Sequence, residues 1–409
     1  MKTLVIGGGA SGMVCAYFSA KNGDDVILIE KNEKLGKKLF ITGKGRCNVT
    51  NDCNEKEFLE NVVTNPKFLF GAIYAFNSQK TMELLERGGL SLKTERGRRV
   101  FPLSDKSSDV IKTLTGLCLE SGVQVHLNET VTDIFEENGE IKAVVTDKGK
   151  YLCDKAVICT GGKSYSSTGS TGDGYKFAKK LGHTVSELKP ALCPLYLKEE
   201  WVKIVQGLSL KNVGFCVVAC GKTIFQQQGE LLFTHFGISG PLVLSASSYI
   251  NKYDKNDISL YLDLKPALSE EQLSDRILRD FLKYKNRDLQ NSLNDLLPKS
   301  LIKIIILLSG ISPEKKNSII TKEERKRLVN ALKYIKFTIR KQASVEESII
   351  TSGGVSVKVI NPKTMESKVV KGLFFAGEVI DVDALTGGYN LQIAFATGFV
   401  AGNGRKEND

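Results

Sequence analysis

The sequence predicts an α/β protein in which one Rossmann-type domain is interrupted by a long insertion. Three observations lead to this prediction. A short apolar strand runs into a glycine-rich turn at residues 7–12. Residues 190–347 contain short segments in which apolar and polar residues alternate, followed by segments with helical periodicity. A glycine-rich pattern returns at 348–388, so the C-terminal part of the chain is expected to complete the first domain.

The first element is the apolar run at residues 4–6, followed by Gly-x-Gly-x-x-Gly at 7–12 and a helical pattern over 13–22. The first glycine would permit a tight turn, the second the approach of a pyrophosphate, and the third close packing of helix on strand. Free N–H groups at the helix start favour an anion. A purely structural glycine turn is the alternative. The expected phosphate contacts are Gly7, Gly9, Ala10, Ser11 and Gly12.

The second strand, at residues 25–29, ends in Glu30, which lies 18 residues beyond Gly12. A carboxylate at this position accepts hydrogen bonds from a ribose diol and disfavours a 2′-phosphate. Glu30 and the adjacent Lys31 are therefore expected to contact a nucleotide. Because strand, turn, helix and acid fall in register, a nucleotide-phosphate cradle is the favoured interpretation.

Composition limits the class of protein. The 409 residues suffice for two or three domains, and 42% apolar with 25% charged residues is typical of a soluble globular chain. The apolar runs are too short to span a membrane, and the N-terminus enters a strand without a signal-peptide layout, so a cytoplasmic location is expected. Nine cysteines without a C-x-x-C pair and three dispersed histidines favour reduced thiols and no metal site.

The net charge of +11 is concentrated between residues 299 and 341, where nine lysines and three arginines stand against three glutamates. This basic segment has two interpretations. It is either the solvated face of helices or an electrostatic footprint for a polyanion. Charge alone favours the solvated face.

A loop rich in glycine and cations follows the second strand, at residues 37–51. Its backbone donors and Arg46 are suited to a diphosphate, and Cys47 and Asn48 would then lie next to a reactive ring. The expected contacts in this loop are Lys38, Thr42, Gly43, Arg46, Cys47 and Asn48.

The middle of the chain continues the first domain. A buried strand from residue 156 ends in Thr160, Gly161 and Gly162, at the start of a Gly/Ser loop suited to cover phosphate or ribityl oxygens. The elements expected before it are helical segments over 55–90 and 109–121, a strand at 123–127, and hairpins over 92–101 and 141–152.

From residue 190 short alternating segments predict an antiparallel sheet or small barrel, and from residue 269 the pattern is helical. The expected strands are 213–218, 223–227, 231–233 and 258–264, and the expected helices are 270–284, 292–308 and 322–333. The expected domains are 1–189 with 348–409 for the nucleotide-binding domain, 190–267 for the inserted barrel and 268–347 for a basic helical domain.

Several motifs together resemble one family. They are the glycine turn with Glu30, TGKGRCN at 42–48, TGG at 160–162 with GDGY at 172–175, GELLFTHFGISGP at 229–241, and GEVIDVD at 377–383 with TGGYN at 386–390. This set is similar to the YhiN/BaiN-type flavoproteins and spans nearly the whole chain. The resemblance implies FAD, a glutathione-reductase-like FAD domain, and an inserted β-barrel and helical domain.

The resemblance also implies cofactor contacts. Glu378, after the last strand of the sheet, is expected to meet the ribityl chain, and the helix start at 388–390 the pyrimidine edge of the flavin. A helix N-terminus there would stabilise the anionic reduced ring. Flavin-binding folds also place backbone near Val131 against adenine. The contacts implied in this way are Val131, Thr160, Gly161, Gly162, Gly377, Glu378, Gly388, Tyr389 and Asn390.

Members of this family resemble three kinds of enzyme, namely rRNA dihydrouridine synthases, bile-acid enone reductases and aminoacetone oxidases. Two of these three reactions reduce an activated C=C, which requires a hydride and an acid for the neighbouring carbon. Cys47 is the first candidate acid, and His235 is a candidate to line the substrate cavity. Their structural alternatives are a small buried filler and a satisfied structural histidine. Because the sequence contains no second dinucleotide cradle, NAD(P)H is expected to reduce FAD from the substrate site.

The basic segment 299–341 then favours one substrate. A small amine or a steroid gives no reason for concentrated cations, whereas RNA does. The favoured function is therefore an FAD-dependent, NAD(P)H-driven reduction of uridine to dihydrouridine in rRNA. A bile-acid-type enone reductase, an amine oxidase acting on a small molecule, and a non-catalytic flavin-carrying RNA-binding or redox-sensing protein are the alternatives.

Overall fold

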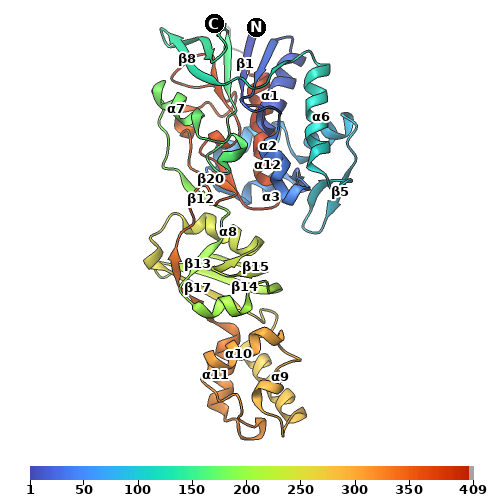
Figure 1. Cartoon of the computed structure of the whole chain (residues 1–409), viewed down its shortest axis with the longest axis vertical. Coiled ribbons are helices and arrows are strands. Elements are labelled where there is room, and N and C mark those ends of the chain that lie inside the picture. The colour runs from blue at the N-terminus through green and yellow to red at the C-terminus, as the bar shows by residue number, and fades with distance from the viewer. Residues whose placement is uncertain (405–409) are drawn as a thin grey trace. The chain divides into compact units, whose positions relative to one another are not determined.

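The computed structural model describes residues 1–404, which form two compact units (Figure 1). The chain leaves unit 1 after Ala191, forms unit 2 from Leu192 to Ala343, and re-enters unit 1 at Ser344. The finer division of the insertion near residue 267 stays a prediction. Residues 405–409 of the expected C-terminal part lie outside the described residues.

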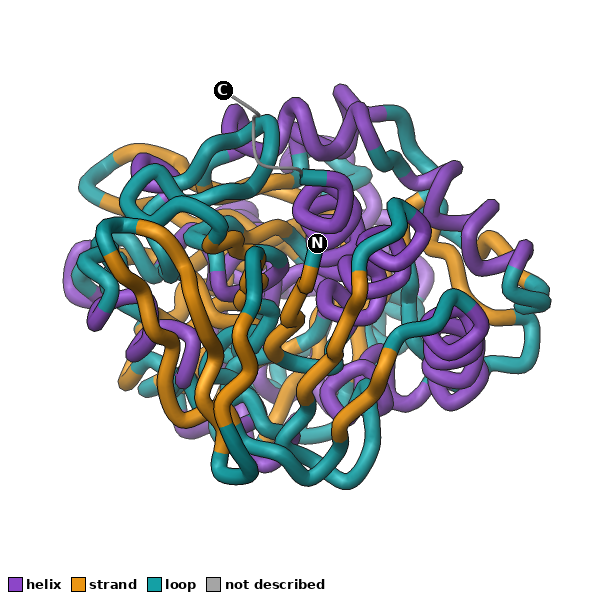
Figure 2. The backbone as a smooth tube through the Cα atoms, turned by 90° about the horizontal axis from the view of Figure 1, so that it is seen from above, coloured by secondary structure: helices purple, strands orange, loops and turns teal. Residues whose placement is uncertain are grey.

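A parallel Rossmann-like sheet forms the centre of unit 1, in the order β21-β11-β1-β2-β7. Figure 2 shows β1, which begins at the N-terminus, within the row of strands. Leu4 lies between Ile27 of β2 and Ala156 of β11. Four of the five residues of β2 are buried, as expected for a strand covered on both faces. The strands are β1 Lys2–Ile6, β2 Asp25–Ile29, β7 Gln124–His126, β11 Lys155–Ile158 and β21 Leu373–Phe375.

Helix α1 of unit 1 packs against α12 and α6. The close approach of α12 requires glycine, because a Cβ on Gly398 would lie 2.5 Å from the carbonyl oxygen of Ser11. The helices are α1 Ala10–Lys21, α2 Lys37–Ile41, α3 Glu55–Glu60, α4 Phe70–Ala75, α5 Ser78–Arg87, α6 Ser107–Glu120, α7 Asp173–Lys180 and α12 Tyr389–Asn403.

Four smaller sheets complete unit 1. The prediction of helix throughout 55–90 was wrong in part: Asn61 ends α3, the short strand β4 follows, and Pro66 starts a new turn. The helix is interrupted again at Phe76 and Asn77, between α4 and α5. The smaller sheets are β3 Thr50–Asn51 with β6 Arg99–Pro102 and β5 Leu92–Glu95; β8 Val131–Glu137 with β9 Glu140–Thr146 and β10 Lys150–Leu152; β12 Lys189–Ala191 with β20 Ile350–Ser352; and β4 Val62–Thr64 with β22 Asp383–Ala384.

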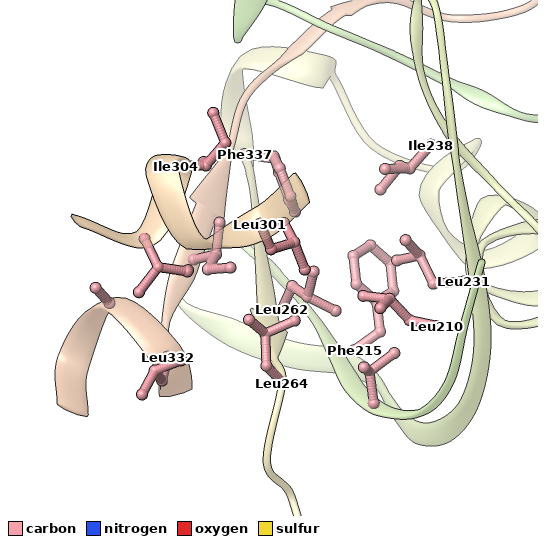
Figure 3. Close-up of a cluster of buried hydrophobic side chains, with 14 of the residues drawn as sticks. Leu210, Phe215, Leu231, Ile238, Leu262, Leu264, Leu301, Ile304, Leu332 and Phe337 are labelled. Carbon is pink, nitrogen blue, oxygen red and sulfur yellow. The ribbon is translucent and has the colours of Figure 1, made fainter. Parts of the chain in front are cut away.

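Unit 2 is built on a seven-stranded antiparallel sheet whose edge strands are β18 and β19, so it is a half-barrel and not a closed barrel. Figure 3 shows sheet side chains such as Phe215 and Leu231 in one buried cluster with Leu301 and Leu332 from the helices. The strands are β13 Leu195–Leu197, β14 Ser209–Ala219, β15 Lys222–Thr234, β16 Gly237–Ser239, β17 Ile258–Asp263, β18 Ile335–Phe337 and β19 Ile339–Lys341.

The helices of unit 2 begin where local chemistry dictates. Capping boxes at Ser269 and Thr321 start α9 and α11 close to the predicted positions. The helix predicted over 292–308 begins only after Pro298, because proline disfavours helical backbone in the residue before it. The helices are α8 Pro241–Ile250, α9 Glu270–Lys283, α10 Lys299–Ser309 and α11 Lys322–Lys333.

Candidate functional site

The glycine turn joins the end of β1 to α1. Gly7 has a φ of +103°, which favours glycine, and a Cβ on Gly12 would lie 1.9 Å from the carbonyl oxygen of Gly7. Gly9 faces open space, since a Cβ there would meet no described atom within 4 Å. In the described part of the chain α1 has neither a capping side chain nor an acidic residue in its first turn. The N–H groups of its first turn are therefore suited to an anion.

Glu30 is 9% exposed at the end of β2 and holds the glycine turn. One carboxylate oxygen accepts the N–H of Gly8 at 2.8 Å, and the other accepts the side-chain amide of Asn32 at 2.6 Å. The oxygen that bonds Asn32 also accepts the backbone N–H of that residue at 2.9 Å, so the acceptor position left for a ribose hydroxyl is on the oxygen that bonds Gly8.

The side chain of Lys31 contacts the loop before α7. Its ammonium group lies 2.8 Å from Asp173 and 2.6 Å from the hydroxyl of Thr171. Burial would raise the pKa of Asp173, but hydrogen bonds from Lys31, Thr171 and Lys176 outweigh it and lower that pKa to about 2. The contact of Lys31 with a nucleotide stays a prediction.

The second glycine-rich region lies against the cradle. A Cβ on Gly377 would lie 2.5 Å from the hydroxyl of Ser11, and one on Gly162 would lie 2.8 Å from a carboxylate oxygen of Glu378. The ammonium of Lys38 donates to Glu378 at 2.7 Å. Three motifs that are far apart in the sequence are therefore brought together at the mouth of the turn.

The start of α12 meets the loop that contains Asn48. A Cβ on Gly388 would lie 2.4 Å from the carbonyl oxygen of Thr50, so only glycine allows this approach. Gln392, which is fully buried, accepts hydrogen bonds from Thr50 at 2.7 Å and from Thr81 at 2.8 Å. The sequence analysis did not single out Gln392. The available signal was an amide flanked by apolar residues in the helix, Leu391 before it and Ile393 after it.

The two polar side chains at the start of α12 are engaged within the chain. The amide of Asn390 bonds both backbone groups of Ala384, at 3.0 and 2.8 Å, and so closes the loop before the helix. Tyr389 packs edge-on against Phe58, and burial raises its pKa to about 12. Flavin contacts of Tyr389 and Asn390 stay predictions.

Arg46 anchors its loop to the β5–β6 hairpin. Its guanidinium contacts Glu95 and Asp105, each at 2.5 Å, and lies over the ring of Phe101 at 4.2 Å. Hydrogen bonds from Arg46 to Glu95 and Asp105 raise the pKa of the guanidinium. Thr42 and Gly43 precede Arg46 in the same loop. The ion pairs of Arg46 with Glu95 and Asp105 do not test its predicted contact with a diphosphate, which stays a prediction.

Two buried oxygens at the site have no hydrogen-bond partner among the described residues. They are Oδ1 of Asn48 and the hydroxyl of Thr160. Buried polar groups are nearly always paired, and an unpaired one costs about 1–3 kcal/mol. Together with the open space at Gly9, these two atoms fit a bound nucleotide cofactor that would supply their partners.

The two candidate catalytic residues have contrasting surroundings. The thiol of Cys47 is buried, and desolvation raises its pKa to about 12, although a hydrogen bond from Thr42 opposes the shift. It therefore carries its proton at neutral pH. His235 is exposed in the turn between β15 and β16 of unit 2 and contacts the ring of Phe236. Val131 opens β8 and is partly buried.

Comparison with known proteins assigns the class. The family described as "HI0933-like protein Rossmann domain" matches residues 1–404. The chain belongs to this family. The predicted resemblance to YhiN/BaiN-type flavoproteins is confirmed, and the family implies FAD. This HI0933-like chain is a flavoprotein oxidoreductase, because its curated relatives are a reductase and a synthase that cover nearly all of it.

Two relatives are equally similar. The 3-dehydro-bile acid delta(4,6)-reductase of Clostridium scindens is 30% identical over 408 residues, with 98% of each chain covered. The ribosomal RNA dihydrouridine synthase of Haemophilus influenzae is 30% identical over 404 residues, covering 97% of this chain and 96% of that protein. The 3-ketosteroid-delta4-(5alpha)-dehydrogenase of Rhodococcus jostii RHA1 shares the fold, with a TM-score of 0.53 at 14% identity over 98% of this chain and 95% of that one.

None of the helices that the structure describes is long and apolar enough to cross a membrane. Within residues 1–404 no group of three or more His, Cys, Asp or Glu side chains is arranged to hold a metal ion.

Thiol labelling tests the burial of Cys47. Iodoacetamide at pH 8 is expected to modify the exposed Cys220 in the native protein and to leave Cys47 unmodified, because a thiol with a pKa of about 12 supplies almost no thiolate. Peptide mass spectrometry before and after unfolding in urea measures both sites. Native labelling of Cys47 at the rate of Cys220 would contradict the buried, protonated thiol.

Proposed function

We propose that this HI0933-like protein reduces uridine to dihydrouridine in rRNA, with FAD as the cofactor and NAD(P)H as the reductant. The two relatives are each 30% identical to this chain, so sequence identity does not decide between an rRNA base and a steroid enone as the substrate. One observation on this chain favours RNA, namely a set of exposed lysines on α10 and α11.

These lysines form two pairs at helical i,i+4 spacing, Lys299 with Lys303 and Lys322 with Lys326, on helices that pack together. All four are exposed, and in the described residues none has an acidic partner. Like charges at this spacing destabilise a helix by about 0.2–0.5 kcal/mol. A phosphate backbone would favour the arrangement.

Other cations of the basic segment serve the fold. Lys315 pairs with Glu324 at 2.6 Å, and Lys333 pairs with Asp263 at 2.6 Å while donating to two backbone carbonyls. The segment therefore contains structural cations as well as exposed ones, and the exposed ones include the four lysines of α10 and α11. We call the four lysines of α10 and α11 the lysine face. The proposal that rRNA is the partner rests on them.

The salt dependence of RNA binding tests the lysine face. Replacing all four lysines by glutamine is expected to reduce the slope of log K against log salt by about 3, since each phosphate contact on a single strand contributes roughly 0.7. Fluorescence anisotropy with a labelled single-stranded RNA measures the slope. A matched control removes four exposed lysines of unit 1 and should leave the slope unchanged: Lys56, Lys67, Lys106 and Lys112. Equal slopes for the two variants would remove the lysine face from the proposal.

Residues of unit 1 supply the proposed cofactor site. FAD, when bound, provides the hydride chemistry. The N-terminus of α1 and Gly9 would hold its diphosphate, Glu30 its adenosine ribose, and Glu378 its ribityl chain. Asn48 and Thr160 would gain the partners that they lack. Cys47 holds a proton at neutral pH and is the proposed acid for the carbon next to the one that receives hydride.

The proposal is tested on rRNA. Ribosomal RNA from a strain that lacks the gene is expected to lose one dihydrouridine, which returns when the wild-type gene is restored. Mass spectrometry of nuclease fragments locates the change, and an unchanged modification profile would exclude the proposal. Anaerobic addition of NADH or NADPH should also bleach the flavin absorbance of the purified protein.

The steroid alternative is favoured by the equally similar reductase of Clostridium scindens. It predicts NAD(P)H consumption with a 3-keto-4-ene bile acid and none that depends on RNA. Assaying both substrates with one enzyme preparation separates the two functions. Rapid peroxide formation from a small amine would instead indicate an oxidase.

A further inference from the structure

Four side chains form a continuous row on the sheet of unit 2. The ring of Tyr196 on β13 stacks on Phe236, with centroids 4.4 Å apart and planes inclined by 24°. The ammonium of Lys341 on β19 lies 4.2 Å from the centroid of the Tyr196 ring. His235 contacts the other ring at 4.8 Å, nearly perpendicular to it. We call Lys341, Tyr196, Phe236 and His235 the aromatic row.

Strand register explains why the row lies away from the core. Tyr196 pairs with Gly237 on one side and with Lys341 on the other. Its neighbours in β13, Leu195 and Leu197, are buried, so alternation along the strand turns Tyr196 to the opposite face. Lys341 and His235 are exposed, and the two rings between them are partly exposed.

This combination has the chemistry of a nucleotide site. A base can stack on the Phe236 ring at the end of the stacked pair, and the ammonium of Lys341, which lies over the Tyr196 ring, suits its phosphate. Arg340, the adjacent residue in β19, is also exposed. A steroid would gain from the apolar surface but not from the ammonium, so the row favours a nucleotide over a neutral ring system.

We propose that the aromatic row binds a nucleotide, with its base stacked at the Phe236–His235 end and its phosphate near Lys341. The proposal deepens the proposed rRNA function and rests on it for the identity of the ligand. Two sources have this chemistry, a nucleotide of single-stranded RNA and the adenosine phosphate of NADPH. The lysine face would bind the RNA backbone, whereas the row would bind one nucleotide.

Phe236→Leu removes the aromatic surface and keeps an apolar side chain. The FAD-loaded full-length variant is expected to bind a labelled uridine-containing single strand about tenfold more weakly, because loss of base stacking on an aromatic ring weakens binding by roughly 5- to 150-fold. Tyr334→Leu is the matched control, since Tyr334 is a 52% exposed aromatic residue of unit 2 outside the row. Anisotropy measures RNA binding, calorimetry measures NADPH binding, and the melting temperature and FAD content report folding.

Each outcome decides between the sources or rejects the site. Loss of RNA binding alone identifies an RNA nucleotide, and loss of NADPH binding alone identifies the dinucleotide. Unchanged affinity for both ligands overturns the proposal. If Phe236→Leu does not fold, Lys341→Gln replaces it, with Lys222→Gln at the exposed end of β15 as its control. The first of these two variants should flatten the salt dependence of RNA binding by about 0.7, and the second should not.

The rRNA profile keeps the two proposals apart. Weakened RNA binding by Phe236→Leu together with an unchanged profile in the deletion strain supports the nucleotide site and rejects the rRNA function. If the deletion strain loses the dihydrouridine but Phe236→Leu binds RNA and NADPH normally, the function is supported and the nucleotide site is rejected.

Discussion

Replacing Gly12 by alanine is expected to produce a protein that retains less than about a tenth of the wild-type FAD. The new Cβ would lie 1.9 Å from the carbonyl oxygen of Gly7 and 3.4 Å from the side chain of Cys159, so the start of α1 must move. That movement displaces the N–H groups that face the expected diphosphate. The ratio of flavin to protein absorbance after gel filtration measures retention.

Gly9→Ala is the informative comparison. Gly9 has a φ of −84°, which alanine adopts without strain, and its Cβ would meet no described atom within 4 Å. The apoprotein of this variant should therefore melt within a few degrees of wild type, whereas Gly12→Ala should be destabilised. FAD binding should nevertheless weaken in Gly9→Ala, because the methyl group would occupy the space of the diphosphate. Normal FAD affinity in Gly9→Ala would show that no diphosphate binds at this turn.

The cradle could be predicted because its determinants are local. The apolar run of residues 25–29 is β2 at the same bounds, and the glycine pattern leads directly into α1. Apolar periodicity and glycine positions can be recognised within short stretches of sequence, so they predict local structure without knowledge of the rest of the fold. The prediction was wrong where a single residue outweighs the apolar periodicity. Pro298 is an example, since α10 begins only after it.

Long-range partners could not be predicted in this way. The acids that Arg46 contacts lie 49 and 59 residues away in the chain, and the sequence analysis named neither of them. Gln392 bonds Thr50 across 342 residues. No local pattern identifies such partners, because they follow from how the sheets and helices pack and not from spacing along the chain.

Replacing Lys155 by methionine is expected to destabilise unit 1 by about 3–5 kcal/mol, since a hydrogen bond from a charged donor contributes roughly 1.5–3 kcal/mol. Lys155 is 1% exposed at the start of β11. Its ammonium donates to the carbonyl oxygens of Ala401 and Gly404 at 2.6 and 2.8 Å, at the end of α12. Without it, the last carbonyls of that helix are buried without a charged partner.

Urea unfolding followed by circular dichroism and flavin fluorescence measures the loss. Lys180→Met, which removes a 62% exposed lysine paired with Asp133, is the control and should cost less than about 1 kcal/mol. FAD retention should also fall in Lys155→Met, because the start of α12 carries Gly388 and Gln392. A variant as stable as the control would show that water replaces the ammonium at the end of α12.

The pH dependence of stability provides an independent test of the same group. Burial lowers the pKa of Lys155 from its ordinary value of 10.5, so at alkaline pH below that value the unfolded chain binds more protons than the folded protein. Stability contributed by this residue therefore rises with pH across that window and is constant below it. Lys155→Met should lack the rise, whereas the control should keep it. Parallel profiles for wild type and Lys155→Met would show that the folded protein leaves the pKa of Lys155 at its ordinary value.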